Sequence, residues 1–248
     1  MSERRSTTTL VGLLRWPPSH SLSPAMQNAG FAAAGLDWVY VPLPTHPERL
    51  AAAVQGLAAA GFAGANVTIP HKTAVLALCD EVDPLAAEAQ SVNTLVVADG
   101  LVRGSSTDIV AIAAAVEAAG RRALVLGSGG SAKAAVAALR QGGAEVTTAT
   151  RHDPGWPPDG RGFDIVVNAT PVKDDAIVSP QPGQQIVDLP YNLKGEPTAL
   201  VTAARAAGCE RVVDGLDILL AQGAASFERW TGQAAPIAVM RAALRTVG

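Results

Sequence analysis

The chain has 248 residues, of which 48% are hydrophobic and 17% charged, and its formal net charge is −3. This length and composition predict one or two globular domains with a sizeable core, and they exclude a miniprotein and a disordered chain. No block of like charge is present, so neither a nucleic acid nor an anionic membrane is an expected partner, and the ligand should be a small molecule.

The spacing of the cysteines and the lengths of the apolar runs indicate the cellular compartment in which the protein is expected. Cys79 and Cys209 lie far apart without CxxC spacing, which argues against a metal cluster and against a disulfide framework. The apolar run over residues 10–14 is shorter than the roughly 7–15 residues of a signal-peptide core. No stretch reaches the roughly 18 apolar residues of a membrane span. We therefore expect a cytoplasmic protein that does not cross a membrane.

Short β-branched runs alternate with Ala-rich stretches in the first half of the chain. This alternation is typical of βα units and predicts an α/β fold with a mainly parallel sheet. Strands are expected over residues 10–14, 38–41 and 65–69, and a hairpin around Asp99-Gly100. Helices are expected after Ser23 as cap with Pro24 at the first position, over residues 47–60, after Pro70, and after Asp83 as cap.

The composition changes after Asp108, and a second domain is predicted to begin near Ser106. Its expected helices cover residues 109–119 and 198–207, with a further helix after a glycine-rich loop. Its expected strands cover residues 123–126, 145–150, 165–168, 185–189 and 211–213. The last stretch, residues 216–247, is predicted to form two helices divided near Pro236.

The glycine-rich loop has the form of a nucleotide-binding turn. Residues 127–132, GSGGSA, follow an apolar strand and open a helix, as the G-x-G-x-x-[GA] fingerprint requires. Glycines allow a sharp turn and a close approach to a pyrophosphate, whose charge then meets the free N–H groups of the helix. The alternative is a tight βα turn without a ligand.

Thr150-Arg151 ends the next predicted strand, where an NAD-selective domain usually offers an acidic residue to the ribose. Arginine favours a 2′-phosphate, because its guanidinium can hydrogen-bond the phosphate and lie over the adenine. The alternative is a solvated loop arginine.

Lys72 and Asp108 are the candidates for proton transfer. Lys72 follows an apolar strand and Pro70, at a strand end where α/β sheets bind ligands. Asp108 begins a predicted helix, where a carboxylate is also favoured by the helix dipole alone. If folding brings the two together, the pair can move a proton during carbonyl–alcohol interconversion.

The order of several short blocks resembles the shikimate dehydrogenase family from residue 20 to about residue 232. NVTIPHK (residues 66–72) is the most diagnostic block. The others are HSLSP (20–24), SVNTL (91–95), STD (106–108), LGSGGSAKA (126–134), NATP (168–171) and QGAASFERWTG (222–232).

The resemblance implies a substrate-binding domain formed by residues 1–105 plus 215–248, and a Rossmann-like dinucleotide-binding domain over residues 106–214. It implies NADP as cofactor, with NAD possible, and Lys72 and Asp108 as the catalytic pair. The implied substrate contacts are Ser21, Ser23, Thr68, Asn93 and Gln222, with Tyr191 nearby. The implied cofactor contacts are Gly127, Ser128, Gly129, Gly130, Ser131, Ala132, Arg151, Asn168 and Thr170.

The chain departs from the family pattern at several places. Ser106 replaces the usual Asn before Thr-Asp, and Thr150 and His152 replace the usual neighbours of Arg151. Residues 152–162 are too rich in Pro and Gly for the helix and strand that the family commonly has there. Residues 172–175 and 188–192 also differ from the family, on the side where the nicotinamide is expected.

The resemblance therefore implies an oxidoreductase of aromatic amino acid biosynthesis, in the pathway to chorismate, that interconverts shikimate and 3-dehydroshikimate. Quinate and aminoshikimate remain open as substrates. The alternative is a non-catalytic ligand-binding or regulatory relative with an impaired nucleotide domain, against which the retention of Lys72 and Asp108 argues. The chain could act as a monomer or a homodimer.

Overall fold

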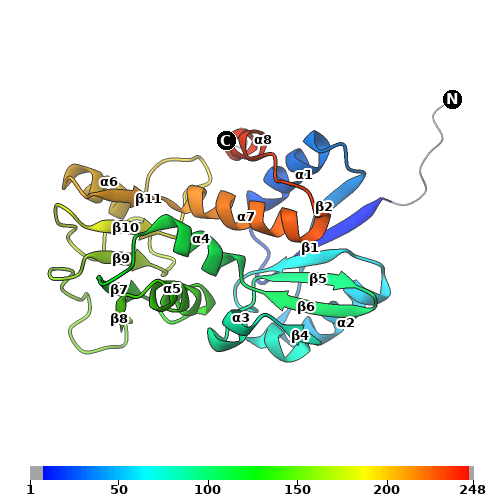
Figure 1. Cartoon of the computed structure of the whole chain (residues 1–248), viewed down its shortest axis with the longest axis horizontal. Helices are drawn as coiled ribbons and strands as arrows, with labels where there is room; N and C mark the ends of the chain where they lie inside the picture. Colours follow the sequence, from blue (N-terminus) through cyan, green and yellow to red (C-terminus); the bar gives the residue numbers. More distant parts are fainter. Residues whose placement is uncertain (1–7, 246–248) are drawn as a thin grey trace.

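Two β-sheets, each with helices on both faces, organise the chain (Figure 1). The computed structural model describes residues 8–245. The end of the predicted C-terminal helix, residues 246–247, lies outside the described residues. The α/β class is confirmed, and within residues 8–245 no helix is long and apolar enough to cross a bilayer.

The first sheet has six strands in the order β2-β1-β3-β5-β6-β4. Their bounds are Thr9–Arg15 (β1), Trp38–Pro44 (β2), Gly64–Val67 (β3), Glu81–Val82 (β4), Thr94–Ala98 (β5) and Leu101–Ser105 (β6). β1 runs parallel to β2 and β3, whereas β5 is antiparallel to both β3 and β6. The predicted Asp99-Gly100 hairpin is confirmed, and it makes this sheet mixed rather than mainly parallel throughout. The short strand β4 was not predicted.

The helices of this half are α1 (Ser23–Ala33), α2 (Leu50–Ala59) and α3 (Pro84–Glu88), with 3-10 helices over Pro47–Arg49 and Ala74–Leu78. The prediction that Ser23 caps α1 is wrong. The cap position is Leu22, and Ser23 is already helical, with its N–H donating to Ser21 Oγ at 3.3 Å. The predicted Asp83 cap is confirmed, because its carboxylate accepts from the Leu85 N–H.

The second sheet has five parallel strands in the order β11-β10-β9-β7-β8. Their bounds are Arg122–Leu126 (β7), Glu145–Ala149 (β8), Ile165–Asn168 (β9), Gln185–Asp188 (β10) and Arg211–Val213 (β11), and the helices are α4 (Thr107–Ala115), α5 (Gly130–Gln141) and α6 (Ala199–Ala206). The prediction that α4 continues to residue 119 is wrong. Val116 is extended, because the Glu117 N–H donates to the Gln185 side chain instead of continuing the helix.

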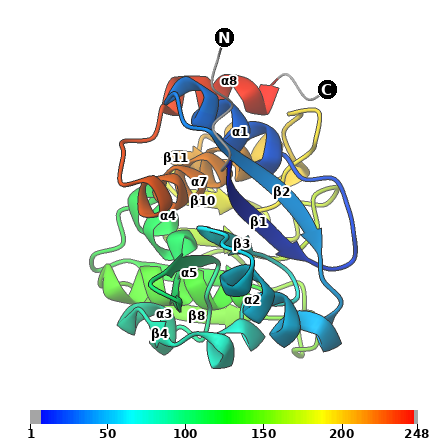
Figure 2. The ribbon, with the colours of Figure 1, turned by 90° about the vertical axis from the view of Figure 1, so that its right-hand side faces the viewer.

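The last two helices return to the first sheet. α7 (Gly215–Thr231) begins beside the second sheet, packs on α4 and crosses toward the first, where α8 (Ile237–Arg245) lies against α1 (Figures 1 and 2). Phe227, Trp230 and Met240 join Phe31 and Tyr40 in one buried cluster. Helix α7 therefore spans both sheets, and the carboxyl ends of their central strands face a common crevice where α/β proteins bind ligands.

Candidate active site

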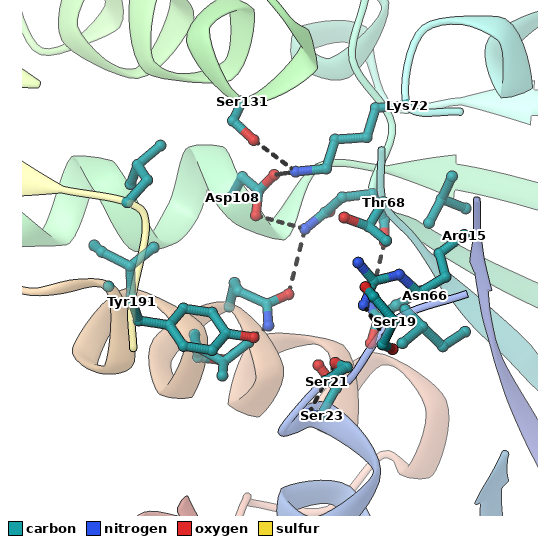
Figure 3. Close-up of a pocket in the computed structure, with 18 of the residues that line it drawn as sticks. Arg15, Ser19, Ser21, Ser23, Asn66, Thr68, Lys72, Asp108, Ser131 and Tyr191 are labelled. Carbon is teal, nitrogen blue, oxygen red and sulfur yellow. Dashed lines mark hydrogen bonds and ion pairs between the residues drawn. The ribbon is translucent and has the colours of Figure 1, made fainter. Parts of the chain in front are cut away.

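A cavity of about 500 Å³ lies where the two sheets meet. Its walls come from the ends of β1 and β3 and from the first turns of α1, α4 and α5, together with α7 (Figure 3). The predicted residues that line it are Ser21, Ser23, Thr68, Lys72, Asn93, Asp108, Ser131, Tyr191 and Gln222. Residues from both ends of the chain thus meet in one cavity.

Lys72 and Asp108 form an ion pair in this cavity. The distance from Lys72 Nζ to Asp108 Oδ2 is 2.6 Å, and the two side chains are only 13% and 12% exposed. Lys72 lies in the turn after β3, and Asp108 lies in the first turn of α4, where the helix dipole also stabilises its negative charge. The low exposure limits screening by water, so the two groups hold each other in a fixed geometry.

Asn93 fixes the carboxylate from its other side. Its Nδ2 donates to Asp108 Oδ1 at 2.8 Å and, at 3.4 Å, to Gln222 Oε1, while its Oδ1 accepts from the Thr107 N–H at 2.7 Å. Both oxygens of Asp108 are therefore engaged, one by the lysine and one by the amide. The Ser106 hydroxyl, at the position where the family usually has Asn, is buried without a hydrogen-bond partner and adds nothing to this network.

A second group of polar side chains lines the cavity beside α1. It contains Ser21, Ser23, Thr68 and Tyr191, none of which is charged (Figure 3). Burial raises the pKa of Tyr191, and the Leu22 backbone, the Ser21 hydroxyl and the charge of Arg15 oppose that rise. The phenol therefore stays neutral and can donate a hydrogen bond to a polar ligand.

The glycine turn between β7 and α5 has the shape that a nucleotide needs. Gly127 has a φ of +116°, and a Cβ there would lie 3.1 Å from Ala169 O, so only glycine fits well. A Cβ on Gly129 would meet nothing within 4 Å, which leaves open space before the first N–H groups of α5. A cavity of about 220 Å³ adjoins the turn and is lined by Gly127, Ser128, Ala132 and Thr150, among others. These features fit a bound pyrophosphate.

The same turn reaches the Lys72–Asp108 ion pair. Ser131 Oγ accepts a hydrogen bond from Lys72 Nζ at 2.9 Å, and a Cβ on Gly130 would lie 2.6 Å from Lys72 Cβ. Ser131, which the sequence predicts as a cofactor contact, thus also binds the lysine.

Five other expected cofactor contacts line neither cavity: Gly129, Gly130, Arg151, Asn168 and Thr170. Arg151 is exposed at the end of β8, and its Nε donates to His152 Nε2 at 3.4 Å. Asn168 is fully buried, with its Nδ2 donating to Asp188 Oδ1 at 2.7 Å and its Oδ1 accepting from the Thr170 N–H. Asn168 and Thr170 therefore shape the loop behind Gly127.

The residues that line this cavity without having been predicted include Arg15, Asn66 and Lys173. Arg15 ends the apolar strand β1, so the rule that pointed to Lys72, a cation at a strand's carboxyl end, could have found it. Asn66 lies inside the NVTIPHK block, and Lys173 follows closely after the NATP block.

Known proteins resemble this chain over nearly its whole length. Residues 15–95 match the family model described as shikimate dehydrogenase substrate binding domain, and residues 215–245 match that of the shikimate 5'-dehydrogenase C-terminal domain. The NADP(+) shikimate dehydrogenase of Moorella thermoacetica is 39% identical, over 99% of this chain and 95% of its own.

Solved structures agree with these matches. The Thermus thermophilus shikimate 5-dehydrogenase, in complex with NADP(H) and shikimate, superposes with a TM-score of 0.83 at 32% identity, over 97% of this chain and all of its own. A ligand-free 5-ketofructose reductase of Gluconobacter has a TM-score of 0.83 at 27% identity, over 98% of this chain and 100% of its own. The chain belongs to the shikimate dehydrogenase family.

Proposed function

We propose that this protein is an NADP-dependent dehydrogenase that interconverts shikimate and 3-dehydroshikimate. The observation that carries the proposal is the Lys72–Asp108 ion pair, which lies at the meeting point of a hydroxyl-lined cavity and the glycine turn. A lysine–carboxylate pair between a substrate in the cavity and a nucleotide on the turn is placed to transfer the proton of a carbonyl–alcohol interconversion.

The nucleotide is held by the glycine turn. The N–H groups at the start of α5 face the open space in front of Gly129 and bind the pyrophosphate, while Arg151 at the end of β8 contacts the 2′-phosphate. NADP, when bound, accepts or supplies the hydride.

Lys72 moves the proton. Its ammonium lies close to where the reacting hydroxyl must be, and its charge stabilises the oxygen as negative charge develops there. Asp108, bonded to both Lys72 and Asn93, keeps the amine in place and compensates its charge between turnovers.

The remaining polar groups bind the substrate's ring hydroxyls and carboxylate: Ser21, Ser23, Thr68, Asn93, Tyr191 and Gln222. An analogue that lacks a hydroxyl would leave one of these groups without a partner, which is how such a site discriminates. We also propose that residues 1–105 plus 215–248 form the substrate domain and residues 106–214 the nucleotide domain. The contacts of α7 and α8 with the first sheet support this division.

The proposal is tested by following NADP+ and NAD+ reduction with shikimate, quinate and aminoshikimate. We expect the highest kcat/KM with shikimate and NADP+. In Lys72→Ala, kcat should fall by about 100- to 10,000-fold, the usual contribution of a general acid–base group. Lys194→Ala, which removes an exposed lysine outside the cavity, is the matched control and should equal the wild type. Binding of shikimate without turnover of any of the three acids would instead support a non-catalytic relative.

A further inference from the structure

Arg15 places a second cation in the substrate cavity. It is the last residue of β1, it is half-buried, and its side chain lines the cavity. Its Nη1 donates to the carbonyl oxygens of Ser19 and His20, both at 3.2 Å. These two bonds hold the guanidinium against the backbone that leads into Ser21, so its position does not depend on a ligand.

The charge of Arg15 is not compensated by the protein. Among residues 8–245, no carboxylate lies within ion-pair distance of it, whereas Lys72 is paired with Asp108. In addition, Arg15 Nε is buried and has no hydrogen-bond partner. A buried, unpaired N–H on a charged group is unfavourable, and an anion in the cavity beside the guanidinium would stabilise its uncompensated charge.

The neighbours of Arg15 suit a carboxylate. Figure 3 shows Ser21 and Ser23 in the lower part of the cavity, with Ser19 above them and Arg15 on the right-hand side, across the cavity from Asp108. Tyr191 lines the same cavity, on the side opposite Arg15 in Figure 3. Hydroxyls can each donate one hydrogen bond to a carboxylate oxygen, but they supply no charge.

We infer that Arg15 is the residue that selects a negatively charged substrate, by pairing its guanidinium with the substrate carboxylate while the hydroxyls of Ser21, Ser23 and Tyr191 complete the contacts. This inference rests on the proposed function. The fold itself does not demand an acid, since a structure with a TM-score of 0.83 to this chain is a 5-ketofructose reductase, named for an uncharged sugar. The choice of an acid must then come from side chains in the cavity, and Arg15 is permanently charged.

The experiment compares shikimate with its methyl ester, which keeps the ring hydroxyls and loses the charge. Dissociation constants for both are measured by calorimetry on the wild type, Arg15→Gln and Arg15→Lys. The ester-to-acid ratio of dissociation constants is the readout. We expect Arg15→Gln to reduce this ratio by about 10- to 100-fold, the range for a hydrogen bond to a charged group. Arg15→Lys, which keeps a positive charge, should reduce the ratio less than Arg15→Gln does. Because both ligands are measured on the same folded protein, partial loss of folding does not affect the ratio.

Two controls separate the alternatives. Arg49→Gln removes an exposed arginine outside the cavity lining and should leave the ratio unchanged. Lys173 also lines the cavity, and if Lys173→Gln reduces the ratio while Arg15→Gln does not, the inference is overturned. An unchanged ratio in both variants also overturns it. Failure of the wild type to oxidise shikimate is a different result, which refutes the proposed function and is read from turnover, not from binding.

Discussion

The Lys72 ammonium is held by two hydrogen-bond partners. Its ammonium donates to Asp108 Oδ2 at 2.6 Å and to Ser131 Oγ at 2.9 Å, and Asp108 is itself held by Asn93. Each of these groups comes from a different element. The amine therefore keeps a single orientation as long as all of these elements keep their relative positions. A mobile lysine would lose the effective concentration on which proton transfer depends.

The Ser131 hydroxyl can be tested as a positioning group. In Ser131→Ala, Lys72 loses one of its two partners, so we expect kcat to fall by about 3- to 10-fold, in line with the loss of one hydrogen bond, while the KM for shikimate changes less than about twofold. Steady-state kinetics with both substrates varied measures this. Ser131→Thr keeps a hydroxyl and should restore most of kcat. An unchanged kcat with a raised KM for NADP+ would show instead that Ser131 contacts the nucleotide.

At this scale the sequence predicts residue types at strand and helix ends, but not which of them meet. Lys72 and Asp108 could be proposed because Lys72 follows the carboxyl end of a strand, because Asp108 begins a helix, and because the blocks around them resemble a family. Ser131 belongs to a glycine fingerprint and was therefore predicted to face a phosphate. Its bond to Lys72 depends on how the two sheets are oriented, which no local pattern encodes.

Among the elements, β9, β10 and α6 are joined by one buried carboxylate. Asp188, at the end of β10, accepts from Asn168 Nδ2 at 2.7 Å and from the hydroxyl of Thr198, which caps α6. Asp188 is fully buried, and this burial raises its pKa to about 6. The two hydrogen bonds oppose the rise without cancelling it.

This raised pKa predicts a specific pH dependence of stability. Between the ordinary value of 3.8 and about 6, folded Asp188 holds a proton that the unfolded chain has released, so its contribution to the free energy of unfolding falls as the pH rises through that window. Asp188→Asn removes this contribution. The free energy of unfolding of the variant minus that of the wild type should therefore increase from pH 4 to pH 7, by about 1.4 kcal/mol per unit at most.

Urea unfolding at several pH values measures the difference. Asp159 is a control whose pKa shift has the opposite sign, because Arg161 lowers the pKa of this exposed carboxyl. The stabilisation that ionised Asp159 provides is lost only as the pH falls. Because that loss occurs only at and below the ordinary value of 3.8, the difference between Asp159→Asn and the wild type should stay nearly constant from pH 4 to pH 7 and change, weakly and in the opposite sense, only at lower pH. A difference between Asp188→Asn and wild type that is constant with pH would show that Asp188 is ionised throughout the range.

Element boundaries were predictable where a local signal sets them. The Asp99-Gly100 hairpin and the Asp83 cap follow from turn and capping chemistry within a few residues. The end of α4 does not follow from a local signal, because the Gln185 side chain that accepts the hydrogen bond from the Glu117 N–H is 68 residues away in the sequence. Likewise β4 has two residues and exists only because β6 offers a free edge.

Across the whole molecule, a small set of contacts closes the glycine turn onto the first sheet's side of the cavity. Ser91 Oγ donates to Gly130 O at 2.8 Å, and Lys133 Nζ donates to Thr73 Oγ1 at 3.3 Å. With the Lys72–Ser131 bond, these contacts bring the nucleotide turn within reach of the substrate cavity. Helix α7 connects the two sheets on the opposite side of the cavity. The distance between the glycine turn and Lys72 is therefore set by how tightly α5 packs on the segment around Lys72.

Substitutions at two glycines of the turn distinguish its packing against Lys72 from its binding of the cofactor. A Cβ at Gly130 would lie 2.6 Å from Lys72 Cβ and 3.0 Å from Lys72 Cδ, too close for any packing without movement. In Gly130→Ala the turn must therefore withdraw from Lys72. We expect kcat to fall by about tenfold or more, since small misplacements at a reacting centre are costly.

Gly129→Ala is the matched comparison. A Cβ there would meet no protein atom within 4 Å, and its φ of −74° suits alanine, so the turn keeps its place against Lys72. The methyl group instead enters the space expected for the pyrophosphate, so the KM for NADP+ should rise while that for shikimate stays the same. Thermal unfolding of both variants checks that each is folded. If Gly130→Ala matched the wild type in kcat, closure of the turn on Lys72 could not be part of catalysis, because the one substitution that prevents the contact would have left the reaction intact.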